Sequence, residues 1–249
     1  MRTTSTDRHH FKKLVICLLL SGFLAGTLFG SLADVQAAEP FVDRVQAVIK
    51  ARLNGEQATS SLVCQGEMIC GIQMLPAAYR NRNYMPLWFG AALRLEKAES
   101  MAEAIQRASE DGLTADDYHL EAIYDILAEI CEQASVLGPA ATDPELWADL
   151  DLILTDAFLL YGSHLSAGRV NPETLHTDWK VNPGAIDLKV HLDSATTTGD
   201  IEAALDRLRP AHSEYQDLRK ALARLRNQAA AGGWPEVDFR QTLRPGDHG

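Results

Sequence analysis

The stretch from Asp143 to Gly168 constrains the fold more than any other part of the sequence. Asp143 suits a helix N-cap, Pro144 suits the first helical position, and Gly168 favours a helix end, so one long helix is predicted. Its apolar residues follow two lines: Trp147, Leu150, Leu154, Ala157 and Tyr161 on one, and Leu146, Ile153 and Leu160 on the other. A helix that is apolar on more than one face belongs in the centre of a domain.

Shorter helical patterns surround this segment. The spacing of apolar residues predicts helices over 41–54 and within 199–210 and 211–233. Ser100 with Glu103 and Thr114 with Asp117 have the spacing of capping boxes, which predict helices ending at Gly112 and near residue 132. Residues 56–71 are predicted to form a loop. A short helix is predicted to begin at 171 and a loop to follow at 179. Only in 185–192 do apolar and polar residues alternate as in a strand. The sequence therefore predicts a mostly α fold with long loops and little or no β-sheet.

One helix, within 211–233, has its apolar residues on a single narrow line. These residues are spaced alternately by three and four: Tyr215, Leu218, Leu222, Leu225 and Ala229. Such spacing predicts one packing seam along the helix.

The first 37 residues have the pattern of a secretory signal. Four basic residues precede the apolar run "LVICLLLSGFLAGTLFGSLA". Val35 and Ala37 fit the small-residue cleavage rule, which places the cut between Ala37 and Ala38. The run is about 20 residues long, enough to span a bilayer if it stays uncleaved, so a membrane anchor is the alternative.

The charge of the remaining chain excludes two classes of binding partner. Without the four basic and two acidic residues of the signal, 19 basic and 32 acidic residues remain, a net charge of −13. Nucleic acid and anionic lipid are poor partners for such a chain.

The cysteines beyond the signal are Cys64, Cys70 and Cys131. In an oxidising exported compartment, Cys64 and Cys70 of "CQGEMIC" are expected to form a disulfide, which leaves Cys131 without a cysteine partner. A metal role for the pair is the weaker alternative, since no second Cys or His pair stands nearby.

Candidate catalytic groups occur in the central helix. Asp149, Asp151 and Asp156 could supply paired carboxylates, but acids in so apolar a helix are more often partnered structural groups. Ser163 and His164 of "GSHLSAGR" resemble a nucleophile and its base. Neighbouring helical residues point about 100° apart, which favours a plain helix C-terminus instead.

No further motif for chemistry is present. The six histidines beyond the signal, at 119, 164, 176, 191, 212 and 248, form no HExxH or HxH pattern, and neither SxxK nor GxSxG occurs. "EDGLTADDY" lacks the acid spacing of a calcium loop. We therefore predict no catalytic, cofactor-binding or metal-binding residue and no cofactor.

Four blocks of sequence, in order, resemble a known family. They are "AAYRNRNYMPLWF" (77–89), "AIQRASEDGLTADDYHLEAI" (104–123), "DLDLILTDAFLLYGSHLSAGRVNPETLHTDW" (149–179) and "ALDRLRPAHSEYQDLRKALARLR" (204–226). Together they look like the N-terminal scaffold domain of the large periplasmic L,D-transpeptidases that cross-link peptidoglycan. The resemblance implies a Gram-negative periplasmic location and covers about residues 40–231.

The catalytic signature of those enzymes is not in this sequence. Their cysteine nucleophile lies in an SHGCxR motif, whereas "SHLSAGR" has Ser166 in place of the cysteine and Arg169 one position late, so no catalytic role carries over. Residues 232–249 resemble a linker and the first turn of a peptidoglycan-binding module. We therefore expect a signal over 1–37, a scaffold domain over 38–231, and a truncated module after it.

Three functions follow as hypotheses. The first is the non-catalytic scaffold of a transpeptidase involved in cell-wall biogenesis. The alternative is a free-standing periplasmic interaction domain that binds peptidoglycan or a wall-synthesis protein. An independent hydrolase or metalloenzyme is a third reading, weakened by the failed motif search.

Overall fold

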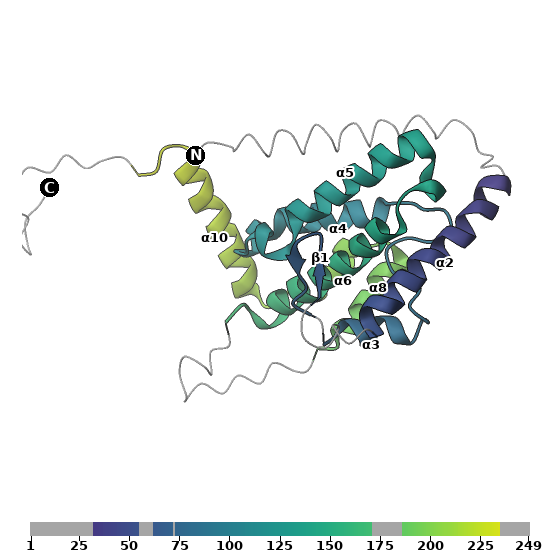
Figure 1. Cartoon of the computed structure of the whole chain (residues 1–249). Coiled ribbons are helices and arrows are strands. Elements are labelled where there is room, and N and C mark those ends of the chain that lie inside the picture. Colours follow the sequence, from purple (N-terminus) through teal and green to yellow (C-terminus); the bar gives the residue numbers. More distant parts are fainter. Residues whose placement is uncertain (1–31, 55–61, 72, 171–185, 235–249) are drawn as a thin grey trace, which may run out of the picture. The chain divides into compact units, whose positions relative to one another are not determined.

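The computed structural model describes residues 32–54, 62–71, 73–170 and 186–234 (Figure 1). Within these ranges the fold is mostly α, as predicted, and the only β-structure is a two-stranded hairpin. The chain divides into two compact units after Ala211. None of the helices in the described ranges combines the length and apolar character needed to cross a membrane.

The unit that ends at Ala211 contains all but one of the described helices, together with the hairpin. Its elements are α2 (Leu32–Asn54), β1 (Val63–Cys64), β2 (Glu67–Met68), α3 (Leu75–Arg80), α4 (Glu96–Gln106), the 3-10 helices η3 (Arg107–Asp111) and η4 (Ala115–Tyr118), α5 (Leu120–Leu137), η5 (Pro139–Ala141), α6 (Pro144–Ala167), α8 (Leu188–Thr198) and α9 (Ile201–Asp206).

Helix α6 is the centre of this unit. Asp143 caps it by accepting a hydrogen bond from Glu145 N at 2.9 Å, Pro144 is its first residue, and Gly168 follows it with a φ of +81°. Most of its residues are buried, and it packs against α2, α3, α4, α5 and α8 (Figure 1). The prediction of a capped central helix is confirmed.

Aromatic rings join α6 to the elements around it. The ring of Trp147 lies 5.8 Å from Phe41 of α2 and 4.6 Å from Phe89, both in edge-on geometry. Trp88 packs near Phe158 at 6.4 Å. Such pairs favour offset or edge-on contacts, and they fix the extended segment "MPLWF" against α6.

The structure corrects three local predictions, two of helix starts and one of a strand. Ser100 does not cap a helix, because α4 already begins at Glu96 and the Ser100 hydroxyl bonds back to the Glu96 carbonyl at 2.8 Å. The helix predicted from Thr114 is interrupted at His119, whose φ of +59° separates η4 from α5. Where a strand was considered over 185–192, α8 forms, capped by the Asp187 side chain.

The hairpin arises in a segment predicted to be a loop. Val63 pairs with Met68 and Cys64 with Glu67, while Gln65 and Gly66 make the turn with positive φ angles of 50° and 84°. A left-handed turn of this kind matches the twist of the two strands. Strands of two residues are too short to show an alternating pattern.

The second unit contains helix α10, Ser213–Ala230. The helix itself is as predicted, yet none of its residues is buried, and Leu218 and Leu225 are 69% and 50% exposed. The signal segment before residue 32, the helix and loop predicted at 171 and 179, and the tail from 235 lie outside the described residues.

Candidate functional site

Asp151 is, with Asp156, one of two fully buried acids of α6. Its carboxylate accepts hydrogen bonds from the Tyr79 hydroxyl at 2.5 Å and from the backbone N–H groups of Leu87 and Trp88 at 3.0 to 3.1 Å. Burial raises the pKa of Asp151, and these donors oppose the rise. The same carboxylate therefore holds α3 and the "MPLWF" segment to the central helix.

Asp149, two residues earlier, is held by a different set of donors. Arg52 of α2 forms an ion pair with Asp149 and also bonds Glu145 at 2.5 Å. The amide of Gln65, in the hairpin turn, donates to Asp149 at 2.7 Å. This acid thus joins α2 and the hairpin turn to α6.

Asp156 is paired with a histidine. His119 Nε2 lies 2.9 Å from Asp156 Oδ2, and His119 Nδ1 lies 2.8 Å from Glu67 Oε2. Ionised carboxylates only accept hydrogen bonds, so an imidazolium with a proton on each ring nitrogen satisfies both contacts. Burial alone would lower the pKa of His119, but the hydrogen bonds to Asp156 and Glu67 outweigh it and raise the pKa.

Asp156 also binds the backbone after the hairpin. Cys70 N donates to it at 3.0 Å and Gly71 N at 2.5 Å. A Cβ at position 71 would lie 2.7 Å from Asp156 Oδ1, closer than real Cβ contacts come. Glycine is therefore required where the chain passes this carboxylate.

The three acids thus make three separate sets of contacts. Each binds a different segment of the same unit, and all three are buried. The prediction that they are partnered structural groups is confirmed. Their partners were not foreseen, because hydrogen bonds between residues 37 to 97 positions apart leave no local pattern in a sequence.

The predicted disulfide between Cys64 and Cys70 is absent from the structure, where both residues are free thiols. Cys64 lies in β1 and pairs with Glu67, whereas Cys70 lies in the turn beyond β2, which ends at Met68. Burial raises the pKa of Cys64 to about 12, and burial also raises that of Cys70, so neither thiol is activated as a nucleophile.

"GSHLSAGR" forms the C-terminus of α6, as predicted. His164 Nδ1 contacts the Tyr118 hydroxyl at 2.9 Å, and the Ser166 hydroxyl donates to the Ser163 carbonyl at 3.1 Å. Arg169 pairs with Asp117 at 2.8 Å. Burial and the nearby Arg169 lower the pKa of His164. These contacts tie the end of α6 to η4.

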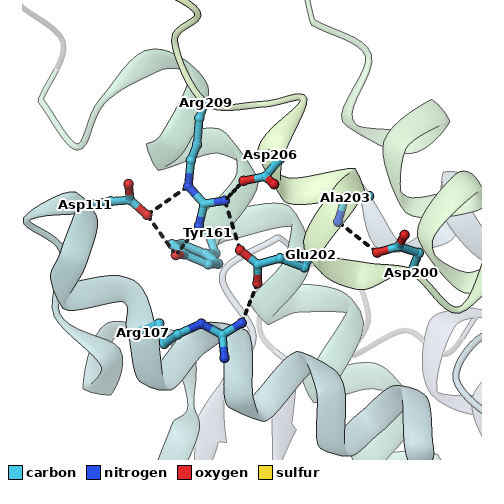
Figure 2. Close-up of polar contacts among 8 residues, drawn as sticks. All are labelled: Arg107, Asp111, Tyr161, Asp200, Glu202, Ala203, Asp206 and Arg209. Carbon is cyan, nitrogen blue, oxygen red and sulfur yellow. Dashed lines mark hydrogen bonds and ion pairs between the residues drawn. The ribbon is translucent and has the colours of Figure 1, made fainter. Parts of the chain in front are cut away.

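A second polar cluster, missed by the sequence analysis, surrounds Arg209 (Figure 2). Its guanidinium bonds Asp111 at 3.0 Å and Glu202 at 3.2 Å and also pairs with Asp206. Burial alone would lower the pKa of Arg209, but Asp111 and the Tyr161 and Glu202 side chains raise it. The side chains of Arg209 and Asp111 are only 7% and 1% exposed, so this is a buried ion pair.

The Arg209 cluster joins three elements of the unit. Figure 2 shows the Tyr161 hydroxyl of α6 between Asp111 and Arg209, at 3.4 and 3.5 Å. Arg107 reaches Glu202 of α9 from the other side at 2.5 Å. The contact fixes the C-terminal end of the unit, two residues before Ala211, to η3 and α6. Residues 98 positions apart pair here, which local spacing does not reveal.

In the part of the chain that the structure describes, no group of three or more His, Cys, Asp or Glu side chains could hold a metal ion. His119 has both ring nitrogens on carboxylates, so it has no lone pair for a metal or for a substrate proton. These polar clusters hold segments of the unit to one another.

In this α-helical unit each central acid holds a separate segment of the chain in place. These contacts are typical of a structural domain. Comparison with family models matches residues 73–222 to the family described as "Scaffold domain". The match covers more than half of the chain, so the chain belongs to this family, and the predicted resemblance to a non-catalytic scaffold domain is confirmed. Neither the curated proteins nor the solved structures contain a match.

Proposed function

We propose that this chain is the non-catalytic scaffold portion of an exported L,D-transpeptidase that cross-links peptidoglycan. The observation that carries the proposal is the scaffold match over residues 73–222, which contains three of the four resembling sequence blocks and most of the fourth. The site supports the same conclusion, because the polar groups of α6 anchor neighbouring segments. A catalytic nucleophile would have to come from an SHGCxR motif, which the printed sequence does not contain.

The direct test is to read the DNA downstream of codon 249 in all three frames. We expect text for a peptidoglycan-binding module and for a transpeptidase domain with its SHGCxR motif. Downstream DNA that encodes neither would contradict the transpeptidase assignment and favour the free-standing interaction domain.

A second test addresses the absence of activity. The purified chain is incubated with tetrapeptide-bearing muropeptides, and the products are separated by liquid chromatography and identified by mass spectrometry. We expect no new cross-linked product. A product that forms with the native chain and disappears with His164→Ala would show that the chain is an enzyme.

Export is the remaining part of the proposal. Cell fractionation should place the chain in the periplasm, and sequencing of its N-terminus should find Ala38 first. An N-terminus at Met1 in the membrane fraction would show that the apolar segment stays as an anchor. Recovery from the cytoplasm alone would contradict the proposal.

A further inference from the structure

The ring of His119 connects the β1–β2 hairpin to the central helix. His119 lies between η4 and α5, its side chain is buried, and its backbone is left-handed with a φ of +59°. Its Nδ1 atom lies 2.8 Å from Glu67 Oε2 in β2, and its Nε2 atom lies 2.9 Å from Asp156 Oδ2 in α6. A left-handed backbone is uncommon for a residue with a side chain, and it persists where surrounding contacts hold it. One imidazole ring thus joins the carboxylates of two separate elements.

The two contacts can be made together only by the charged ring. An imidazolium has an N–H on each nitrogen, whereas a neutral imidazole has one N–H and one lone pair. A lone pair cannot donate to a carboxylate oxygen, and the two repel each other. When His119 loses its proton, one of its two carboxylate contacts is therefore lost.

The structure indicates that the contact with Glu67 is the one lost. The Glu67 side chain is 43% exposed, so water can solvate its carboxylate. Asp156 is fully buried, and a buried carboxylate that loses a hydrogen-bond donor costs more free energy than an exposed one. The remaining proton therefore stays on Nε2, toward Asp156, and the lone pair of Nδ1 faces Glu67.

The protonation of His119 is set by few charged groups. Burial lowers its pKa, but the hydrogen bonds to Asp156 and Glu67 outweigh it and raise the pKa above 6.5. The Cys70 thiol, just after the hairpin, lies near the same two carboxylates. Charged groups of the neighbouring elements have other partners: Asp117 of η4 pairs with Arg169, Asp111 of η3 with Arg209, and Asp149 of α6 with Arg52. The side chains that α4 and α5 bury are apolar.

We propose that His119 is a pH-sensitive switch for the hairpin: the charged ring holds Glu67 and keeps residues 62–69 against α6, and the neutral ring allows this segment to open. The inner side of the segment is apolar, since Leu62, Cys64 and Ile69 are buried. Opening exposes these three side chains to solvent. The segment is held at pH values below 6.5 and opens as the pH rises through the folded pKa of His119.

The remaining contacts of the hairpin keep this opening local. The backbone N–H groups of Cys70 and Gly71 still bind Asp156, so the chain stays attached to α6 just beyond the segment. The Gln65 amide bonds Asp149 in the closed form. The neutral state is therefore an equilibrium between closed and open hairpin, in a unit that is otherwise folded.

Amide hydrogen exchange of the purified full chain measures the opening. Mass spectrometry of peptides that cover residues 62–71 reports on the hairpin, and peptides from α6 report on global unfolding. Intrinsic exchange also accelerates with pH, so the native chain is compared with Glu67→Gln at each pH. The ratio of the native rate to the variant rate in the hairpin should rise roughly threefold to tenfold from about pH 5.5 to about pH 8.5.

Glu67→Gln is informative because its amide can accept from a charged ring and donate to a neutral one, so the contact no longer depends on the proton. Alkylation of the buried Cys64 thiol, compared between the same two chains at each pH, should show the same change in ratio. Glu145→Gln is the matched control. It removes a partly exposed carboxylate whose partner, Arg52, stays charged across this range, so the hairpin should keep the native pH dependence.

An NMR titration of the imidazole ring, assigned with His119→Gln, links the opening to its cause. It gives the folded pKa of His119, and the midpoint of the change in hairpin exchange should coincide with it.

Three results would overturn the proposal. A ratio between native and Glu67→Gln exchange that is constant with pH means that the ring does not control the hairpin. A midpoint that differs from the folded pKa of His119 assigns the transition to another group. Hairpin amides that exchange no faster than those of α6 at about pH 8.5 open only by global unfolding, which leaves no local switch.

Discussion

Helices α6 and α10 both have apolar residues at helical spacing, and they differ in how far these residues are buried. Helix α6 has 24 residues, and most of them are buried, including Asp149, Asp151 and Asp156. Helix α10 has 18 residues, and none is buried. Both patterns were visible in the sequence, one as several apolar lines and the other as a single seam.

The difference shows how far amphipathic spacing can be interpreted. Apolar residues at helical spacing indicate that a face needs a partner, but they do not indicate which part of which molecule supplies it. The several lines of α6 are covered within its own unit by α2, α5 and α8. The one line of α10 leaves Leu218 and Leu225 half or more exposed.

The largest effect is expected for Asp151→Ala in the centre of α6. The change leaves the N–H groups of Leu87 and Trp88 buried without an acceptor, so we expect the free energy of unfolding to fall by about 3–5 kcal/mol. Urea unfolding followed by tryptophan fluorescence measures it. Asp193→Ala, in an exposed ion pair of α8, is the control and should cost less than about 1 kcal/mol.

Asp151→Asn keeps the test informative if the alanine variant does not fold. The amide retains one acceptor oxygen, so we expect an intermediate loss of about 1–3 kcal/mol. Equal and small losses for both variants would mean that the buried contacts of α6 do not stabilise the unit, and the contrast with α10 would fail.

Arg209→Met should produce the next largest loss. It preserves much of the apolar stem of the side chain but leaves the Asp111 carboxylate buried without its cation, which should cost about 2–4 kcal/mol. The exposed pair of Arg94 and Glu96 supplies the control, because Arg94→Met should change the unfolding free energy by less than about 1 kcal/mol. Similar values for the two variants would show that burial of the ion pair has no effect.

Two glycines permit a closely matched comparison of packing near α6. Gly71→Ala places a methyl group 2.7 Å from Asp156 Oδ1, whereas a Cβ at Gly90 meets nothing within 4 Å. We expect Gly71→Ala to destabilise the chain by about 1–3 kcal/mol and Gly90→Ala to change stability by less than about 1 kcal/mol. Thermal unfolding followed by circular dichroism measures both changes. A larger loss of stability for Gly90→Ala than for Gly71→Ala would contradict the close contact between position 71 and Asp156.

The sequence was sufficient for α6 and for the helix of α10, and the reasons are local. Asp143, Pro144 and Gly168 are neighbours of the turns that they start and end, so capping rules apply directly. The His119 break between η4 and α5 was not predictable, because its left-handed backbone is held by Asp156 and Glu67 from other elements.

The Cys64 and Cys70 prediction failed for a related reason. A seven-residue segment with a cysteine at each end has the spacing of a small disulfide loop, but here the segment folds into a hairpin that contains Cys64 and ends before Cys70, and both thiols are free. Register depends on the turn geometry, and two-residue strands carry too little pattern to reveal it. The Arg209 cluster likewise required the fold, since its members are scattered from residue 107 to residue 209.

His119 and His164 should give the stability of the unit opposite dependences on pH. The folded pKa of His119, which faces Glu67 and Asp156 with the Cys70 thiol nearby, is raised above the ordinary value of 6.5. Its stabilising contribution is therefore complete below about pH 6.5 and is lost as the pH rises through the folded pKa. Comparing native chain and His119→Gln by urea unfolding from pH 5.5 to 9 should show a difference that shrinks with rising pH.

His164 supplies the opposite sign. Its folded pKa is lowered, mainly by burial and by Arg169, so the folded chain binds its proton less readily than the unfolded chain. The native chain should therefore lose stability relative to His164→Gln as the pH falls through 6.5. The same slope for both histidine variants would contradict the assignment of His119 as a doubly bonded imidazolium.

The smallest effect is expected on the seam of α10. Leu218 is 69% exposed, so Leu218→Ala removes little buried surface, and the free energy of unfolding of the α6 unit should change by less than about 0.5 kcal/mol in dilute solution. Leu154→Ala, the same change in α6 where the side chain is fully buried, should cost about 2–5 kcal/mol. Near-UV circular dichroism in urea, which follows the packed aromatic residues, measures both. A loss above about 1 kcal/mol for Leu218→Ala in dilute solution would mean that the seam is covered by the chain itself, and α10 would then belong with α6 as an element that the chain packs internally.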